Sequence, residues 1–254
     1  MINKLKKAYG KTYRKSFLLI VLLSVCLVFL TMSCGLDVVA VLLDDNVSIT
    51  ETPPTIESEF GDMFFCFTTS KLDNSTSLGQ NYIYYKIYNS STIHDSEVNS
   101  ITNIASDTNK KYNSATSMIN TYHYQQLWYK ENPEDESGTW FEISNAAHDI
   151  KIRLTSYLTE DYAAGIWIDN QKKGVPVRVV KSRPFDFGRD DEYLPLINED
   201  DTKNFVETQG DDDRNKYYVA LFSVFMMLDD DFVPVYNPVH YLGSVKIDST
   251  SYDN

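Results

Sequence analysis

The sequence predicts a mainly β protein, an antiparallel β-sandwich with one or two helical insertions, preceded by a signal-peptide helix. Short runs rich in Tyr, Phe, Val and Ile recur along the chain, and several alternate apolar with polar residues. Hydrophobic residues make up 43% of the 254 residues, which excludes a disordered chain. No repeat of fixed period is visible, so we expect a single β-sandwich domain over residues 60–254.

The first residues have the features of an export signal. Residues 1–33 contain six bases and no acid, and residues 17–30 (FLLIVLLSVCLVFL) form a 14-residue apolar run. A helix of that length spans about 21 Å, which is short of the roughly 30 Å hydrocarbon core of a bilayer. We therefore predict a signal peptide over residues 1–33 rather than a transmembrane helix.

Cys34 is the predicted lipidation site. The apolar run ends in LTMSCG, which resembles a bacterial lipobox in the relaxed form associated with spirochaetes. The resemblance implies that Cys34 carries a covalent diacylglycerol and an N-acyl chain such as palmitate, and no other cofactor is expected. An ordinary cleaved signal, in which Cys34 is incidental, is the alternative.

The predicted anchor places the protein in the bacterial cell envelope, attached to a membrane through its lipid. By resemblance to other lipoproteins of diderm bacteria, Gly35 favours the outer membrane over the inner membrane, with the periplasmic side and the cell surface as alternatives. Residues 34–59 are predicted to be a lipidated tether and domain edge. Within them Pro53 and Pro54 favour extended backbone, either a spacer or an edge strand.

Charge and cysteine content narrow the range of partners and of covalent links. Without residues 1–33 the chain has 17 bases and 36 acids, a formal charge of −19, which argues against nucleic acid as a partner. Cys66 is the one cysteine besides Cys34 in that part of the chain, so no intramolecular disulfide is expected. Its apolar neighbours (MFFCF) favour a buried packing residue over a nucleophile.

Strand signals follow one another along the exported chain. The segment at residues 81–88 (NYIYYKIY) has one more aliphatic face, made by Ile83, Tyr85 and Ile87. Residues 216–228 form the most apolar stretch after the signal peptide and are predicted to be a long central strand. The other predicted strands cover residues 62–69, 149–158, 163–168, 175–180 and 242–247, with a hairpin loop over residues 169–174.

Two stretches have a helical rather than a strand period. Apolar residues spaced three to four apart predict a helix over residues 95–112, with Asp95 or Ser96 as its N-cap. Residues 115–129 fit either a second helix or a strand.

Several segments carry a family resemblance. They are CGLD at the predicted mature start, PPT before an FCFTTS strand, YIYYKIYNS, and the late segments KYYVALFSV and YLGSVKI. Over most of its length the chain resembles the uncharacterised lipoproteins of treponemal spirochaetes. That resemblance implies a fold and an anchor but no chemistry. The YIYYKIYN segment also resembles the third strand of a fibronectin type III or immunoglobulin-like sandwich.

Known catalytic motifs are missing from the sequence. The four histidines form no HxH or HExxH pattern, and GxSxG, SxxK, GxxxxGK and GxGxxG do not occur. His94 and His148 each precede an Asp, but neighbouring side chains point in different directions, so solvated loop residues are expected. We therefore predict no catalytic activity. The alternative is an envelope enzyme that uses a carboxylate pair such as Asp190 and Glu192.

Residues 186–215 are unusually acidic, with eleven acids and three bases. A calcium-binding surface module is the alternative function here, because Asp200, Thr202, Asn204 and Asp211 are spaced faintly as in a calcium loop. Phe205 stands where that loop needs glycine, so a solvated acidic loop and no metal site are the favoured interpretation.

The predicted function is that of a lipid-anchored extracytoplasmic protein with a non-catalytic binding or envelope-structural role. Its ligand is expected to be a protein or a glycan. The many tyrosines and three tryptophans are assigned to the sheet core, with a carbohydrate platform as the alternative; the tryptophans are Trp128, Trp140 and Trp167.

Overall fold

The computed structural model describes residues 46–53, 64–72, 79–156, 163–187, 190–196, 198–203, 216–228 and 231–248. The predicted signal peptide and Cys34 lie outside these residues, and so do Asn204 and Asp211. The fold is mainly β, with 44% of the described residues in strands and 18% in helices, which confirms the predicted class. Within the described part of the chain no helix is both long enough and apolar enough to cross a bilayer.

The first sheet has seven strands. Their order across the sheet is β1 (Val47–Glu51), β2 (Phe65–Thr69), β8 (His148–Arg153), β9 (Gly165–Ile168), β10 (Gln171–Val177), β5 (Trp128–Lys130) and β6 (Thr139–Trp140). All neighbouring pairs are antiparallel. Edge strand β1 lies within the residues predicted as tether and domain edge, just before Pro53.

The second sheet is built on two long strands. β3 (Gln80–Tyr88) pairs antiparallel with β12 (Lys216–Leu228) over nine residue pairs. Beyond β12 lie β13 (Pro234–Tyr236) and β14 (His240–Asp248). Beyond β3 lie β4 (Gln125–Gln126), β7 (Glu142–Ser144) and the short parallel strand β11 (Thr202–Lys203).

The two sheets enclose the main core. The face of β3 predicted from alternation, with Ile83, Tyr85 and Ile87, points into this core and each of the three is fully buried. Facing side chains on β2, Phe65 and Phe67, are also buried, because alternate residues of a strand point to one face. Sheet-on-sheet packing confirms the predicted sandwich.

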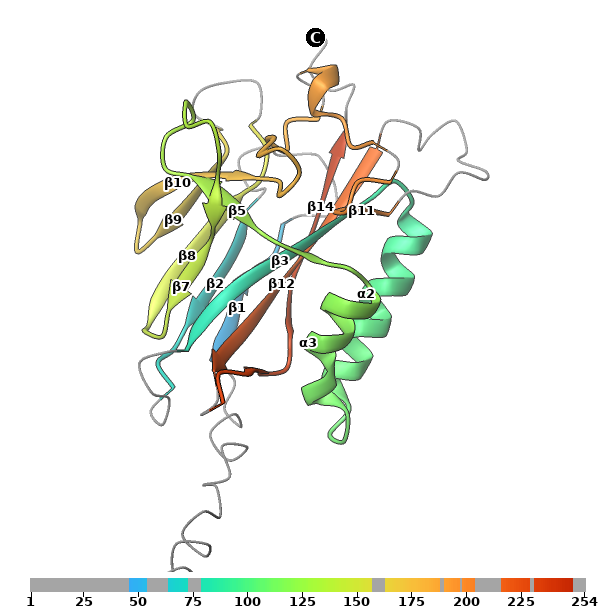
Figure 1. The fold of residues 1–254 in the computed structure, drawn as a ribbon, viewed down its shortest axis with the longest axis vertical. Coiled ribbons are helices and arrows are strands. Elements are labelled where there is room, and N and C mark those ends of the chain that lie inside the picture. Colours follow the sequence, from blue (N-terminus) through green and yellow to red (C-terminus); the bar gives the residue numbers. More distant parts are fainter. Residues whose placement is uncertain are drawn as a thin grey trace, which may run out of the picture. The chain divides into compact units, whose positions relative to one another are not determined.

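A helical layer covers the other face of the second sheet. Helix α2 (Ser91–Ser106) is followed by η3 (Lys111–Asn113), α3 (Ser114–Thr116) and the π-helical turn η4 (Ser117–Thr121). Figure 1 shows α2 and α3 on the side of β3 and β12 opposite the first sheet. The remaining short helix, η6 (Asp191–Tyr193), lies in the acidic segment.

This layer makes a second core from residues that alternate with those of the main core. Val98 and Ile101 of α2 and Met118 of η4 pack with Phe222 and Val224 of β12, and all are buried. β12 therefore buries both of its faces, which explains why its sequence reads as a continuous apolar run rather than an alternating one.

Several predicted boundaries are wrong in detail. The helix begins at Ser91 rather than at residue 95, because the Ser90 side chain accepts the backbone N–H of Ile93 and so acts as the N-cap in place of Asp95 or Ser96. The stretch at residues 115–129 contains both alternatives, a helical turn and then strands β4 and β5.

The predicted hairpin loop at residues 169–174 is also too long. Asp169 and Asn170 have φ of 51° and 63°, which is the backbone that a two-residue hairpin turn needs. β10 therefore starts already at Gln171, and the turn consists of Asp169 and Asn170 alone.

A polar cavity beside helix α2

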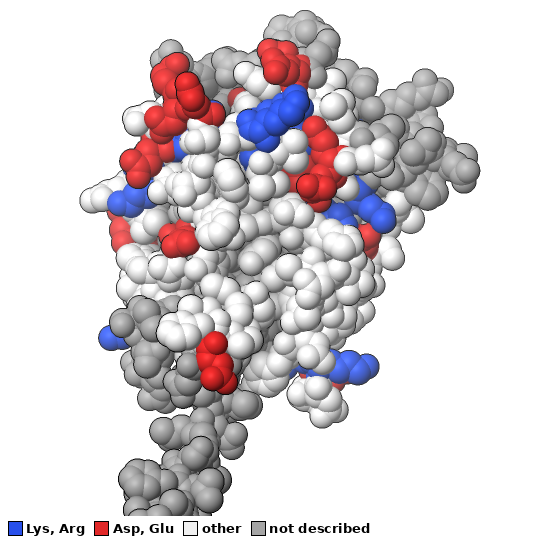
Figure 2. Space-filling view, viewed as in Figure 1, with Lys and Arg blue, Asp and Glu red and all other residues white. Residues whose placement is uncertain are grey.

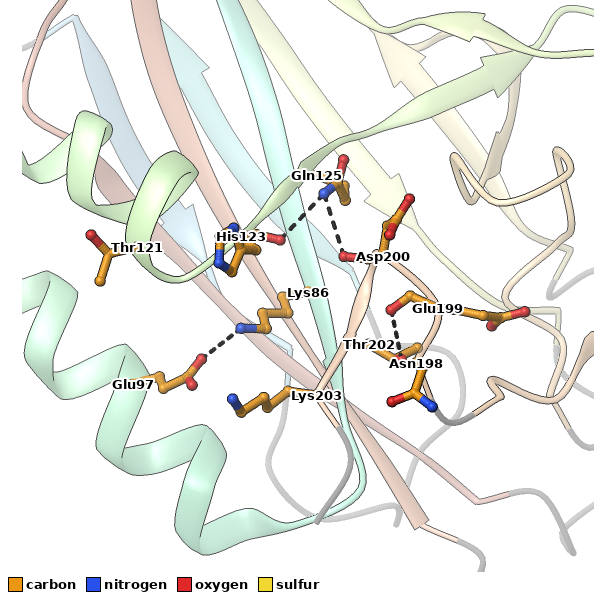
Figure 3. A pocket seen from close by; sticks show the side chains of 10 residues that line it. All are labelled: Lys86, Glu97, Thr121, His123, Gln125, Asn198, Glu199, Asp200, Thr202 and Lys203. Atoms are coloured by element: carbon orange, nitrogen blue, oxygen red, sulfur yellow. Dashed lines mark hydrogen bonds and ion pairs between the residues drawn. The ribbon is translucent and has the colours of Figure 1, made fainter. Parts of the chain in front are cut away.

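A cavity of about 550 Å³ lies between the helical layer and the acidic segment. Its residues come from β3, α2, the segment from the end of η4 into β4, and β11 with the loop before it. Figure 3 shows that they surround one space although they lie far apart in the sequence. The lining residues are Lys86, Glu97, Thr121, His123, Gln125, Asn198, Glu199, Asp200, Thr202 and Lys203.

Lys86 is the buried cation of this cavity. It lies on the face of β3 that the helices cover, and 3% of it is exposed. Its Nζ donates to Glu97 Oε2 at 2.9 Å and to the carbonyl oxygen of Tyr122. Burial lowers the pKa of Lys86, and the Glu97 carboxylate opposes that shift. An ammonium has three protons and the described residues accept two, so one N–H is left for a ligand.

Two buried tyrosines hold the ion pair in place. The hydroxyl of Tyr88 lies 3.0 Å from Glu97 Oε2 and 2.9 Å from the hydroxyl of Tyr124. Lys86 Nζ lies 5.4 Å from the centroid of the Tyr88 ring and 5.8 Å from that of Tyr124, close enough for cation–π attraction. Burial raises the pKa of both tyrosines, so they stay neutral donors at neutral pH. The buried face of Lys86 is thus fixed by neutral groups and one carboxylate.

The rim of the cavity is polar and exposed. Gln125 Nε2 donates to the carbonyl oxygens of His123 and Asp200, and these bonds join the turn after η4 to the acidic segment. His123 has φ of 57°, a left-handed backbone that non-glycine residues adopt infrequently and that recurs at functional sites. Lys203 extends from β11 on the opposite side of the space.

Arg178 fixes the acidic segment to the sandwich. It is fully buried, and its Nε and Nη2 donate to the two carboxylate oxygens of Asp201 at 2.8 and 2.7 Å. Nη2 also pairs with Glu199, and Asp201 accepts the Tyr85 hydroxyl at 2.7 Å. Burial alone would lower the pKa of Arg178, but the bonds and charges of Asp201 and Glu199 outweigh it and raise the pKa. This pairing holds one wall of the cavity in position.

The solvated-loop interpretation is therefore wrong for part of the acidic segment. Asp201 is buried and Glu199 is half-buried, and both neutralise Arg178. Of the calcium-loop candidates, Asp200 is exposed on the cavity rim. The Thr202 hydroxyl donates to the carbonyls of Leu196 and Glu199, so it helps to shape this loop. In the described part of the chain no three His, Cys, Asp or Glu side chains gather as metal ligands.

The alternative carboxylate pair also has a local structural role. Asp190 Oδ1 accepts the backbone N–H of Glu192 at 2.9 Å, and this bond stabilises the start of η6. Glu192 is exposed, and neither residue lines the cavity around Lys86.

Two histidines differ from the prediction of solvated loop residues. His94 lies in α2 and is 7% exposed, and its Nδ1 contacts Asp95 Oδ1 at 2.8 Å although the two residues are neighbours in the helix. His148 lies on β8 and pairs with Asp169 at 2.8 Å instead of with Asp149.

The prediction for Cys66 is confirmed, and that for the tryptophans is wrong. Cys66 is 6% exposed, and burial raises the pKa of its thiol. Trp140 is 55% exposed, whereas Trp128 and Trp167 are half-buried. Trp140 lies on the edge strand β6, and none of the three tryptophans belongs to either buried core cluster.

Sequence reasoning missed the residues of the cavity as a group. One signal was visible: Lys86 interrupts an aromatic strand on a face whose other residues pack against helices. Comparison of the chain with known protein families, with curated proteins and with solved structures finds no match. The geometry of the cavity therefore carries the functional argument by itself.

Proposed function

We propose that the protein is a lipid-anchored, extracytoplasmic binding protein whose cavity around Lys86 takes a saccharide unit of a glycan. The anchor rests on the LTMSCG motif at Cys34 and the ligand class on the cavity. At about 550 Å³ the cavity lies within the size range of small-molecule sites. No metal or further cofactor is part of the proposal.

The single observation that carries the ligand class is the mixture of donors and acceptors around the cavity. Lys86 and Lys203 present N–H groups, whereas Asp200 and Glu97 present carboxylate oxygens. A sugar hydroxyl both donates and accepts, so a polyhydroxylated ligand matches such a lining, whereas an anion or an apolar molecule meets unpaired groups.

The charge distribution also agrees with an uncharged ligand. On the face shown in Figure 2, acidic side chains gather toward the upper end, and the middle of the face is largely uncharged. Such a surface neither attracts nor steers anions strongly.

A calorimetric panel tests the ligand. The mature protein in detergent is titrated with monosaccharides, short glycans and free amino acids. A saccharide is expected to bind, at least about tenfold more weakly to the Lys203→Ala variant and unchanged to Lys151→Ala, whose exposed lysine lies on β8 outside the cavity. Binding of amino acids in place of saccharides would overturn the ligand class, and equal binding by Lys203→Ala would overturn the site.

The anchor has its own test, which does not depend on the ligand. Cells that express the wild type are expected to incorporate labelled palmitate into the protein, and Cys34→Ala is expected to abolish the label and move the protein to the aqueous phase of a detergent partition. An unlabelled wild type in the aqueous phase overturns the anchoring proposal.

A further inference from the structure

A second cavity, of about 380 Å³, lies where the first turn of α2 meets β14. It is lined by Thr52, Pro53, Ser91, His94, Tyr241 and Ser244, among others. Its wall is shared in part with the network of the first cavity, since the His94 ring packs edge-on against Tyr88 at 5.4 Å between centroids.

A chain of hydrogen bonds runs along one side of this second cavity. Asp95 Oδ1 lies 2.8 Å from His94 Nδ1, and His94 Nε2 lies 2.6 Å from Ser244 Oγ. The hydroxyl of Tyr241 lies 2.6 Å from the same Oγ. With Asp95 accepting from Nδ1, a neutral imidazole has its lone pair on Nε2, so Ser244 is the donor toward His94.

The fold encloses His94, whereas the Asp95 side chain is 68% exposed. His94 is 7% exposed and lies between the rings of Tyr88 and Tyr218. Next to Ser244 the pairing of β14 with β12 shifts register, and Gly243 has φ of 119°, which a side chain rarely permits. Bulges of this kind are frequent beside active sites because they re-aim a side chain.

We propose that Ser244 is a nucleophile, activated by His94, and that the second cavity hydrolyses small esters. Ser244 Oγ bonds to the ester carbonyl carbon while its proton passes to His94 Nε2. His94 returns that proton to the leaving alcohol as the carbon–oxygen bond to the alcohol breaks, which leaves an acyl-serine. Water then attacks the acyl carbon, passes one proton through His94 back to Ser244 Oγ, and releases the carboxylic acid. Asp95 is a positioning residue, since it holds the His94 tautomer.

This inference departs from the prediction of no catalytic activity and does not rest on saccharide binding at Lys86. The absence of GxSxG says only that Ser244 does not lie on the strand-to-helix turn of the common serine hydrolases. Ser244 lies instead in the middle of a strand, in YLGSVKI, and its partners come from a helix 150 residues earlier.

The protein contains its own matched control. Ser144 Oγ lies 2.9 Å from His148 Nε2, and His148 Nδ1 lies 2.8 Å from Asp169 Oδ2, so the same three residue types meet at similar distances. Ser144 is exposed and none of the three lines either cavity described above. A solvated serine of this kind has no bound substrate to attack.

The experiment treats the mature protein with a fluorophosphonate probe and locates the adduct by mass spectrometry, with p-nitrophenyl acetate hydrolysis as a second readout. Labelling at Ser244 is expected, with loss of label and ester hydrolysis in Ser244→Ala and a fall of at least about 100-fold in His94→Gln. Ser144→Ala is expected to react as the wild type does. The melting temperature of each variant shows whether it is folded. Absence of an adduct on Ser244 in the folded wild type, or labelling of Ser144 to the same extent, overturns the proposal.

Discussion

Two buried cations, Lys86 and Arg178, differ in how fully their charge is matched by partners within the protein. Arg178 donates to both oxygens of Asp201 and to Glu199, and its charge is fully matched inside the sandwich. Lys86 has one carboxylate and one carbonyl as partners, and it faces a cavity. Burial lowers the pKa of Lys86, whereas the partners of Arg178 raise its pKa. A cation with spare hydrogen-bonding capacity beside a cavity is therefore the better candidate for function.

The largest expected effect comes from breaking the matched cation. Arg178→Met leaves the fully buried Asp201 carboxylate without its cation, and we expect a loss of about 3 to 5 kcal/mol in the free energy of unfolding. Urea unfolding measures it. Arg183→Met is the control and should cost clearly less, because Arg183 contacts Glu199 at 3.3 Å and Glu199 keeps its bond from Arg178 in this variant. Equal losses of stability in the two variants would contradict a larger stabilising role for Arg178 than for Arg183.

Alkaline pH tests both clusters at once, because each contains buried phenols. Burial raises the pKa of Tyr84, Tyr88 and Tyr124 on the Lys86 side and of Tyr85 beside Arg178, from an ordinary value of 10.0. Above pH 10 the unfolded chain loses phenolic protons that the folded chain keeps. The stability that these tyrosines contribute is therefore fully present below pH 10 and falls above it. Thermal unfolding followed from pH 8 to 11 is expected to show this fall, and a flat profile above pH 10 contradicts the burial of these rings.

The sequence predicted the sheets better than the site. β12 matches its predicted bounds because a strand buried on both faces leaves an unmistakable apolar run of 13 residues. The start of α2 was misplaced because several serines and Asp95 compete as N-caps, and the end of β3 at Tyr88 decides in favour of Ser90. The pairing of Arg178 with Asp201 could not be predicted, because the two residues are 23 positions apart and the path of the loop between them determines which acid is buried.

Lys86→Met sharpens the comparison at a smaller scale. In this variant Glu97 keeps its bond from the Tyr88 hydroxyl, and its side chain is 14% exposed whereas that of Asp201 is fully buried. We therefore expect a loss of only about 1 to 2 kcal/mol, well below that of Arg178→Met, together with loss of saccharide binding. The sign of a pH effect adds a check. The pKa of Lys86 is lowered in the folded protein from the ordinary value of 10.5. Between these two pKa values the unfolded chain keeps a proton on Lys86 that the folded chain has lost, so the contribution of Lys86 to the free energy of unfolding rises with pH in that range.

The same thermal unfolding series, run on both proteins, measures that difference. The wild type is expected to gain stability relative to Lys86→Met as pH rises from 8 toward 10. Parallel profiles for the two proteins contradict a destabilised ammonium at this position. Lys71→Met, which removes an exposed lysine outside the cavity, is the control and should leave the profile unchanged.

Cys66 extends the comparison to a buried group that is neutral, and its substitution has the smallest expected effect on stability. Burial is the main cause that raises the pKa of its thiol, and the nearby Glu51 carboxylate raises it further, so the neutral form persists at neutral pH. A thiol reagent at pH 7 is expected to react with the folded protein only as fast as β2 opens, and promptly in denaturant. Cys66→Ala should cost about 1 kcal/mol, a small-cavity penalty, and leave saccharide binding and ester hydrolysis unchanged. Rapid labelling of the folded protein at pH 6 to 7 would mean that the thiol is exposed as a thiolate. That result would contradict the claim that burial keeps Cys66 neutral.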